Sequence, residues 1–193
     1  SPHSAPKEPL YLEIDFEKGN PTALDGQPYQ PIELMKKLNQ LGGKYGIGRV
    51  DMVENRLVGI KSREIYEAPG ATILLCAHKE LESLVLDRET MHFKEGIAGK
   101  YAELVYYGLW HSDLRRALDA FLKVLQEQVT GRVRMRLQPG QCVCVGRKSP
   151  FSLYSEDLAT YTQKDIFDHK GGEYFCKLWG LPLKLSAQIK AKK

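Results

Sequence analysis

Ionisable and hydrogen-bonding side chains gather in one short stretch of the sequence, residues 48–69. The stretch contains Asp51, Glu54, Asn55, Arg56, Lys61, Ser62, Arg63, Glu64, Tyr66 and Glu67. A zwitterionic small ligand needs a carboxylate for its ammonium group, a cation for its carboxylate and a hydroxyl group, and this stretch has all three. The residue types favour two interpretations about equally. One is the polar wall of a small-molecule pocket, and the other is an ion network that fixes a strand and its exit loop.

The cysteines and histidines do not predict a metal site or a catalytic pair. Cys142 and Cys144 are two positions apart, so on a strand they point to the same face, and a tetrahedral zinc site needs other spacing and more ligands. Cys76 and Cys176 are distant in sequence, and we interpret all four as small core residues. The histidines form no His-Glu-x-x-His pair, and nothing selects one of them for catalysis. The five are His3, His78, His92, His111 and His169.

A glycine-rich segment, residues 42–48, reads Gly-Gly-Lys-Tyr-Gly-Ile-Gly. Its spacing and its lack of a Lys-Ser/Thr ending match neither a phosphate-binding loop nor a complete dinucleotide fingerprint. We therefore expect a flexible connection between a helix and a strand, and no nucleotide site.

A basic pattern follows later in the chain. Arg132, Arg134 and Arg136 alternate with apolar residues in the first strand of an expected hairpin, which turns at 139–140 and returns through 142–145. Nucleic acid is one possible partner for such a stripe. Aromatic stacking residues do not interleave with it, so a solvated face, or one paired with acids of another subunit, is favoured. We expect no nucleic-acid partner.

The first elements are predicted to be a hairpin and a helix. Residues 10–17 alternate between apolar and polar side chains, which predicts a half-buried strand, and turns are expected at 18–21 and 25–26. Pro31 suits the first turn of a helix that Gly42 would end.

Residues 49–60 are predicted to be a strand. Because apolar residues fall on both parities, we expect a central strand that is covered on both sides. Residues 69–110 are helical in character with a cap at Asp87, and a further helix begins after Ser112 and ends at Gly131. Sequential strands with helices between hairpins predict an α+β fold with a mostly antiparallel sheet, packed helices and a protruding C-terminal helical tail.

Composition limits the class of protein. The chain has 193 residues, 42% of them hydrophobic and 27% charged, which is typical of a globular domain and excludes disordered or coiled-coil classes. The formal charge of +4 is too small for a dedicated nucleic-acid binder. No apolar run is long enough to span a membrane. Few cysteines in a chain of this length favour reduced thiols and a cytoplasmic protein.

Three stretches resemble the argininosuccinate synthase family, in its C-terminal synthetase and multimerisation domain. The first is Gly48-Arg49-x-Asp51-x-Val53-Glu54-Asn55-Arg56-x-x-Gly59-x-Lys61-Ser62-Arg63-x-x-Tyr66-Glu67. The second reads Ala102-Glu-Leu-Val-Tyr-Tyr-Gly-Leu-Trp-His-Ser112, and the third Gly146-Arg-x-Ser-Pro-x-Ser-Leu-Tyr154. The resemblance implies a ligase of arginine biosynthesis and the urea cycle. The ureido oxygen of citrulline attacks the α-phosphate of ATP, and the amino group of aspartate then displaces AMP.

The resemblance also implies how the work is divided. Glu54 and Tyr66 transfer as contacts to citrulline. No catalytic, cofactor-binding or metal-binding residue is expected in this chain, because the family's Ser-Gly-Gly-x-Asp-type ATP loop is absent. ATP with Mg²⁺, and aspartate, would be held by a missing amino-terminal domain, and the chain alone should be inactive.

The implied domain organisation has three parts. Residues 1–9, with three prolines, are expected to be a linker from a missing amino-terminal nucleotide-binding domain. Residues 10–172 would form the citrulline-binding synthetase domain, and residues 173–193 an oligomerisation tail of a homotetramer. The alternative function is a non-catalytic oligomerisation or scaffold domain.

Overall fold

The computed structural model describes residues 1–159 and 170–192, which form two compact units, Ser1–Leu153 and Tyr154–Lys193. The elements of the first unit are a 3-10 turn η1 (Pro2–Ser4), β1 (Leu10–Glu17), β2 (Asn20–Leu24), β3 (Gln27–Pro28), α1 (Pro31–Lys44), β4 (Arg49–Asn55), β5 (Lys61–Glu67), α2 (Pro69–Val85), α3 (Arg88–Tyr106), α4 (Asp113–Gln126), β6 (Gly131–Gln138) and β7 (Gln141–Lys148). Those of the second are α5 (Glu156–Ala159), α6 (Lys170–Trp179) and α7 (Leu181–Lys190). The prediction of an α+β fold with an antiparallel sheet is confirmed.

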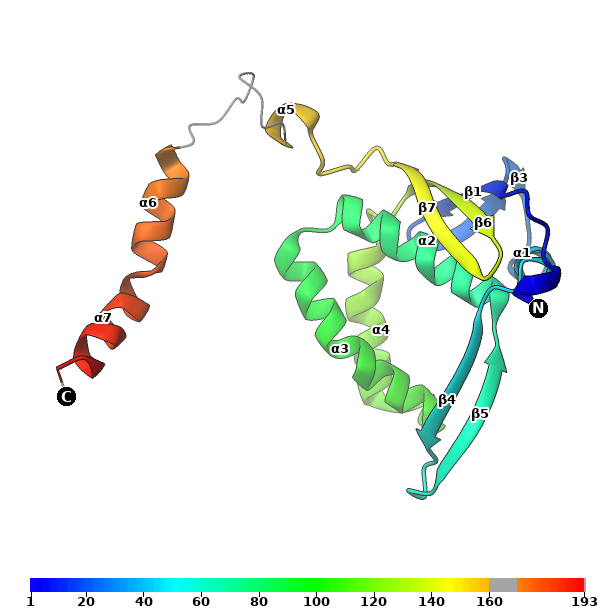
Figure 1. Ribbon diagram of the computed structural model, residues 1–193, viewed down its shortest axis with the longest axis horizontal. Coiled ribbons are helices and arrows are strands. Elements are labelled where there is room, and N and C mark those ends of the chain that lie inside the picture. Colours follow the sequence, from blue (N-terminus) through cyan, green and yellow to red (C-terminus); the bar gives the residue numbers. More distant parts are fainter. Residues whose placement is uncertain (160–169, 193) are drawn as a thin grey trace. The chain divides into compact units, whose positions relative to one another are not determined.

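The main sheet has five strands in the order β3-β2-β1-β6-β7, and every pairing is antiparallel. The alternation predicted for residues 10–17 is confirmed, since Leu12, Ile14 and Phe16 are buried. Leu12 lies opposite Met135 and Ile14 opposite Val133, so the two central strands contribute to the same core. Figure 1 shows α1 and α2 packed beside this sheet.

The helix predicted from Pro31 is confirmed at its start but continues past Gly42 to Lys44. Gly42 does not end the helix because it lies where α1 packs against α2: a side chain there would meet Pro69 and Ile73. The expected connection between a helix and a strand is confirmed for residues 45–48, but its expected looseness is not. Its remaining residues hold tightly to the body, since Tyr45 is almost fully buried.

Two side-chain caps predicted from the sequence are confirmed. Asp87 accepts a hydrogen bond from the Thr90 backbone N–H at the start of α3, and Ser112 caps α4 in the same way. The helix that was expected to reach Gly131 ends at Gln126 instead. The chain turns early because the fully buried Val129 leads into β6, and its N–H donates to the Gln126 carbonyl.

The basic hairpin is confirmed as β6 and β7, and its first arginine, Arg132, is paired with acids within the chain. Arg132 contacts Asp15 at 2.5 Å and Glu13 at 3.2 Å, both on the neighbouring strand β1. Arg134 stacks over the ring of Tyr11. The partners of Arg132 are therefore acids of the same chain, whereas the sequence favoured solvent or acids of another subunit.

The prediction of a central strand over residues 49–60 is wrong. β4 ends at Asn55, the chain turns, and β5 returns to form a separate two-stranded sheet, which is exposed on both faces. Gly59 permits the turn with φ of 82°. Val53 and Ile65 are 64% and 65% exposed, so apolar residues on both parities reflect two open faces rather than two covered ones. The hairpin extends away from the main sheet (Figure 1).

Among the described residues of the second unit, several large apolar side chains are exposed. Phe175 and Trp179 stack on each other with ring centroids 5.5 Å apart, yet both remain exposed, as do Leu178 and Leu183. In the described parts of the chain, no helix is both long and apolar enough to cross a membrane.

One glycine controls how the β4–β5 hairpin joins the body, and its substitution yields a prediction. Gly48 has φ of 76°, and a side chain there would lie 2.7 Å from the carbonyl group of Ala68. Gly59 has a similar φ but open space around it. We expect Gly59→Ala to cost about 1 kcal/mol of unfolding free energy from backbone strain alone. Gly48→Ala should cost about 1–3 kcal/mol more because backbone atoms must move.

Urea unfolding followed by circular dichroism measures both variants. Equal losses in the two variants would contradict the close approach at the base of the hairpin.

Candidate functional site

The site is built on one face of the β4–β5 hairpin. Antiparallel pairing sets Val50 opposite Tyr66, Met52 opposite Glu64 and Glu54 opposite Ser62. Paired residues share a face, and alternate residues along each strand return to it. We call this the polar face, and its members are Val50, Met52, Glu54, Ser62, Glu64 and Tyr66.

The two residues singled out from the sequence meet on this face. The Tyr66 hydroxyl donates a hydrogen bond of 3.0 Å to Oε1 of Glu54, reaching diagonally from β5 to β4. Tyr66 is 45% exposed and Glu54 is half-buried, so both are accessible from solvent. The turn between the strands thus joins an acid and a phenol that are twelve positions apart in sequence.

The hydrogen bond sets the protonation of the phenol. It raises the pKa of Tyr66 above its ordinary value, because the Glu54 carboxylate accepts the phenolic proton and its negative charge disfavours a phenolate. Tyr66 therefore stays neutral at neutral pH. Its oxygen can still accept a hydrogen bond, and the remaining lone pairs of Glu54 can accept bonds from an ammonium or ureido N–H.

An ion pair lies beside these two residues. Nη2 of Arg56 is 2.9 Å from Oε1 of Glu64, and Nε of Arg56 donates to the Ser62 hydroxyl at 3.2 Å. The guanidinium lowers the pKa of Glu64 below its ordinary value, and the Ser62 hydrogen bond acts in the same direction. Glu64 and Arg56 are therefore both ionised.

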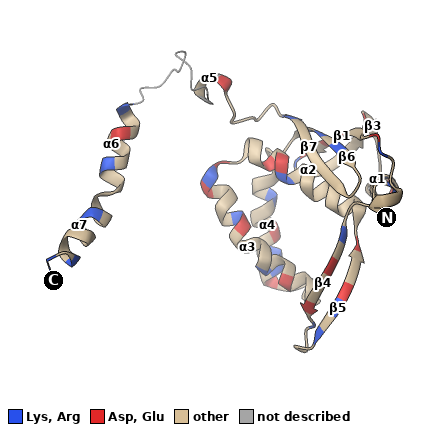
Figure 2. Cartoon of the chain, viewed as in Figure 1, with Lys and Arg blue, Asp and Glu red and all other residues tan. Residues whose placement is uncertain are grey.

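The opposite face of the hairpin also pairs its charges. Arg63 contacts Asp51 through two hydrogen bonds of 2.8 and 2.5 Å, and Arg49 lies 3.0 Å from Glu67. Both signs of charge follow the two strands in Figure 2. Of the four carboxylates on β4 and β5, only Glu54 has no cation within ion-pair distance in the part of the chain that the structure describes.

The residue types left two interpretations open, an ion network and a pocket wall, and each describes a different part of the hairpin. The ion-network interpretation describes Arg56 with Glu64, and Asp51 with Arg63. Glu54 lies outside that network and faces solvent with a neutral hydroxyl as its partner. An accessible carboxylate without a cationic partner can accept strong hydrogen bonds from a cationic or N–H-bearing ligand.

A third element borders the polar face, which the sequence analysis did not connect with it. Tyr106, at the end of α3, interacts electrostatically with Arg56 and Tyr66 and contributes to the raised pKa of each. The end of α3 lies close to β4 in Figure 1. No local pattern in the sequence carries this proximity, because it depends on how the helix pair α3–α4 packs beside the hairpin.

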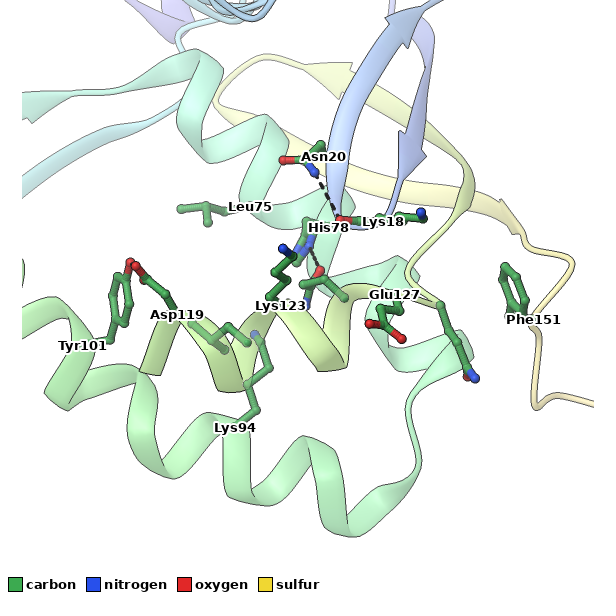
Figure 3. A pocket seen from close by; sticks show the side chains of 14 residues that line it. Lys18, Asn20, Leu75, His78, Lys94, Tyr101, Asp119, Lys123, Glu127 and Phe151 are labelled. Carbon is green, nitrogen blue, oxygen red and sulfur yellow. Dashed lines mark hydrogen bonds between the residues drawn. The ribbon is translucent and has the colours of Figure 1, made fainter. Parts of the chain in front are cut away.

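A large cavity lies elsewhere, between the β1–β2 turn and helices α2, α3 and α4 (Figure 3). It has a volume of about 1050 Å³ and includes neither Glu54 nor Tyr66. Many of its polar groups already bond with one another: the Tyr101 hydroxyl donates to Asp119 at 2.7 Å, and His78 bonds Gln126 at 2.7 Å. Such mutual satisfaction leaves fewer groups for a ligand.

A buried acid beneath this cavity was missed from the sequence. Glu82 is only 4% exposed, pairs with Lys94 at 2.9 Å and accepts a hydrogen bond of 2.7 Å from Gln126. The available signal was its place in α2 beside the buried Leu81, where a charge requires partners. Its partners are all protein groups, so we interpret Glu82 as the anchor of α2 to α3 and α4.

The thiols behave as expected with one exception. Cys76, Cys142 and Cys144 pack against the core, and burial raises the pKa of Cys142 to about 12. Cys176 is exposed on α6, so its assignment to the core is wrong. Among the described residues, no three His, Cys, Asp or Glu side chains gather as metal ligands would.

The glycine-rich segment does not fit a nucleotide. A side chain at Gly42 would meet Pro69, and one at Gly48 would meet Ala68. These glycines therefore admit close packing of protein against protein rather than a phosphate cradle.

Comparison with known proteins adds independent evidence on the family of the chain. The chain matches the family model described as "Arginosuccinate synthase C-terminal domain" over residues 1–186. A curated argininosuccinate synthase from Synechococcus sp. (strain JA-3-3Ab) is 58% identical over 184 residues, which cover 95% of this chain and 46% of that protein. One from Desulfitobacterium hafniense (strain DSM 10664 / DCB-2) is 57% identical over 192 residues, 100% of this chain and 48% of the relative. The chain thus spans about half the length of the curated relatives it matches.

The Glu54–Tyr66 bond is tested by the titration of the phenol. Glu54→Gln keeps the shape of the side chain but removes the charge, so the pKa of Tyr66 should fall toward its ordinary value. Carbon NMR of the labelled tyrosine ring reports the titration, with Tyr66→Phe to assign the signal. Asp51→Asn, on the opposite face, should leave the titration unchanged. An unchanged pKa in Glu54→Gln would show that the two groups do not interact in solution.

Proposed function

The chain belongs to the argininosuccinate synthase family as its C-terminal domain, and from this premise we propose that it forms one wall of a citrulline site. The complete protein would ligate citrulline and aspartate to argininosuccinate, with conversion of ATP to AMP and pyrophosphate. The observation that carries the proposal is the hydrogen-bonded pair of Glu54 and Tyr66 on the exposed polar face.

The chemistry of the pair suits citrulline. Glu54 has no cation of its own within the described residues, so an ammonium or ureido N–H group can bind it without displacing an ion pair. The neutral Tyr66 hydroxyl holds Oε1 of Glu54 in place and offers an acceptor beside it. The role of the pair is to position the ureido nucleophile, and positioning of this kind can lower a barrier by several kcal/mol.

The remaining ligands are assigned to the rest of the complete protein. ATP, Mg²⁺ and aspartate would be bound by the half of the relatives' length that this chain does not span. This assignment agrees with the glycine-rich segment, which is packed against the body and does not fit a phosphate. We infer that the chain alone has no ligase activity and that the complete protein works in the cytoplasm, where its four free cysteines would stay reduced.

The second unit is proposed as an oligomerisation element of a homotetramer. Its apolar residues Phe175, Leu178, Trp179 and Leu183 are exposed on α6 and α7. Contiguous exposed apolar side chains on helices are typical of subunit interfaces. A scaffold domain without any part in substrate binding is the alternative, and kinetics separate the two.

Glu54→Gln in the complete protein tests the substrate contact. Loss of a charge-assisted hydrogen bond is worth about 1.5–3 kcal/mol, so citrulline KM should rise, or kcat fall, roughly 10-fold or more. Glu67→Gln breaks an ion pair on the opposite face and should leave both constants near wild type. Sizing chromatography should show the same oligomer for all three proteins. Normal kinetics in Glu54→Gln would remove Glu54 from the pocket and favour the scaffold.

Removal of residues 173–193 tests the oligomerisation element. The truncated complete protein should form smaller species in light scattering, because the exposed apolar face of α6 and α7 is lost with it. A truncated protein that keeps the full oligomeric mass would contradict this assignment.

A further inference from the structure

Arg56 lies near two carboxylates of the polar face, Glu54 and Glu64. It follows Glu54 by two positions, and its N–H donates to the Ile60 carbonyl, which extends the ladder by one pair. Its side chain therefore emerges on the same face as Glu54 and Glu64. A guanidinium group reaches a side chain two residues back along a strand as readily as one diagonally opposite.

The structure shows which acid Arg56 binds. Two bonds orient the guanidinium, one to Glu64 at 2.9 Å and one to the Ser62 hydroxyl at 3.2 Å. Ser62 lies directly opposite Glu54 in the pairing. The guanidinium is thus held beside Glu54, close enough for an electrostatic interaction but without an ion pair.

The pairing of Arg56 with Glu64 determines whether the Glu54 carboxylate is free to bind a ligand. Exposed ion pairs are individually weak, so the preference of Arg56 for Glu64 over Glu54 depends on which carboxylates carry a charge. If Glu64 lost its charge, Glu54 would become the nearest strong acceptor for Arg56. A substrate N–H group would then have to displace the guanidinium before it could bind Glu54.

We propose that Glu64 is a positioning residue for the citrulline site: by holding Arg56 together with Ser62, it keeps the Glu54 carboxylate free for substrate. The inference rests on the proposed function, because it assumes that Glu54 binds citrulline. It assigns Glu64 no contact with the substrate. Its effect is on ground-state binding, so it concerns citrulline KM rather than kcat.

The test uses the complete protein and three variants. Glu64→Gln should raise citrulline KM about 2–5-fold and change kcat less than about 2-fold, because only the competition of an exposed, weakly bound guanidinium for Glu54 changes. The double variant Glu64→Gln/Arg56→Gln removes the competing cation and should return KM to within about 1.5-fold of wild type. Asp51→Asn breaks the ion pair on the opposite face and should leave KM unchanged.

The rescue distinguishes positioning from structural support. If Arg56 and Glu64 only stabilised the hairpin, removing both would be at least as harmful as removing one. A double variant no better than Glu64→Gln, or a Glu64→Gln variant with normal KM, therefore overturns the inference.

Glu54→Gln, measured beside these variants, separates this inference from the proposed function. If Glu54→Gln changes the kinetics for citrulline and Glu64→Gln leaves KM normal, only the role of Glu64 is overturned. If both variants have normal KM and kcat for citrulline, the proposed contact between Glu54 and citrulline is itself overturned.

Discussion

The register of one strand pair determines what the candidate site can be. Pairing of Glu54 with Ser62 and of Val50 with Tyr66 puts the acid and the phenol on one face, where they bond at 3.0 Å. A slip of one residue in either strand would turn half of the polar face to the opposite side. No core holds this register, because both faces of the hairpin are open. The turn sets it instead, through backbone hydrogen bonds of 2.9 Å from Arg56 to Ile60 and 2.7 Å from Gly59 to Arg56.

The rest of the first unit serves as the support for this hairpin. The five-stranded sheet and helices α1 and α2 form the core, and Gly48 and Ala68 join it to the hairpin through a backbone hydrogen bond of 2.9 Å. Helices α3 and α4 bring Tyr106 toward the polar face and are tied to α2 through the buried Glu82. The packed core of the first unit thus positions the β4–β5 hairpin, and with it the polar face, from the base of the hairpin.

Local signals in the sequence were sufficient for most of the fold. The alternation of Leu12, Ile14 and Phe16 predicted the central strand, and the cap at Asp87 predicted the division between two helices. The hairpin at residues 49–67 was misjudged, because apolar residues on both parities indicate burial in an average protein and here lie exposed. Glu54 and Tyr66 came from a family resemblance. Their contact, and the choice of Arg56 between two acids, depend on a register that no single stretch of sequence specifies.

A crystal structure of the complete protein with citrulline bound tests the central claim most directly. We expect a nitrogen or oxygen of citrulline within about 3.2 Å of a Glu54 carboxylate oxygen and of the Tyr66 hydroxyl. Citrulline bound elsewhere, with the polar face covered by another part of the protein, would contradict it.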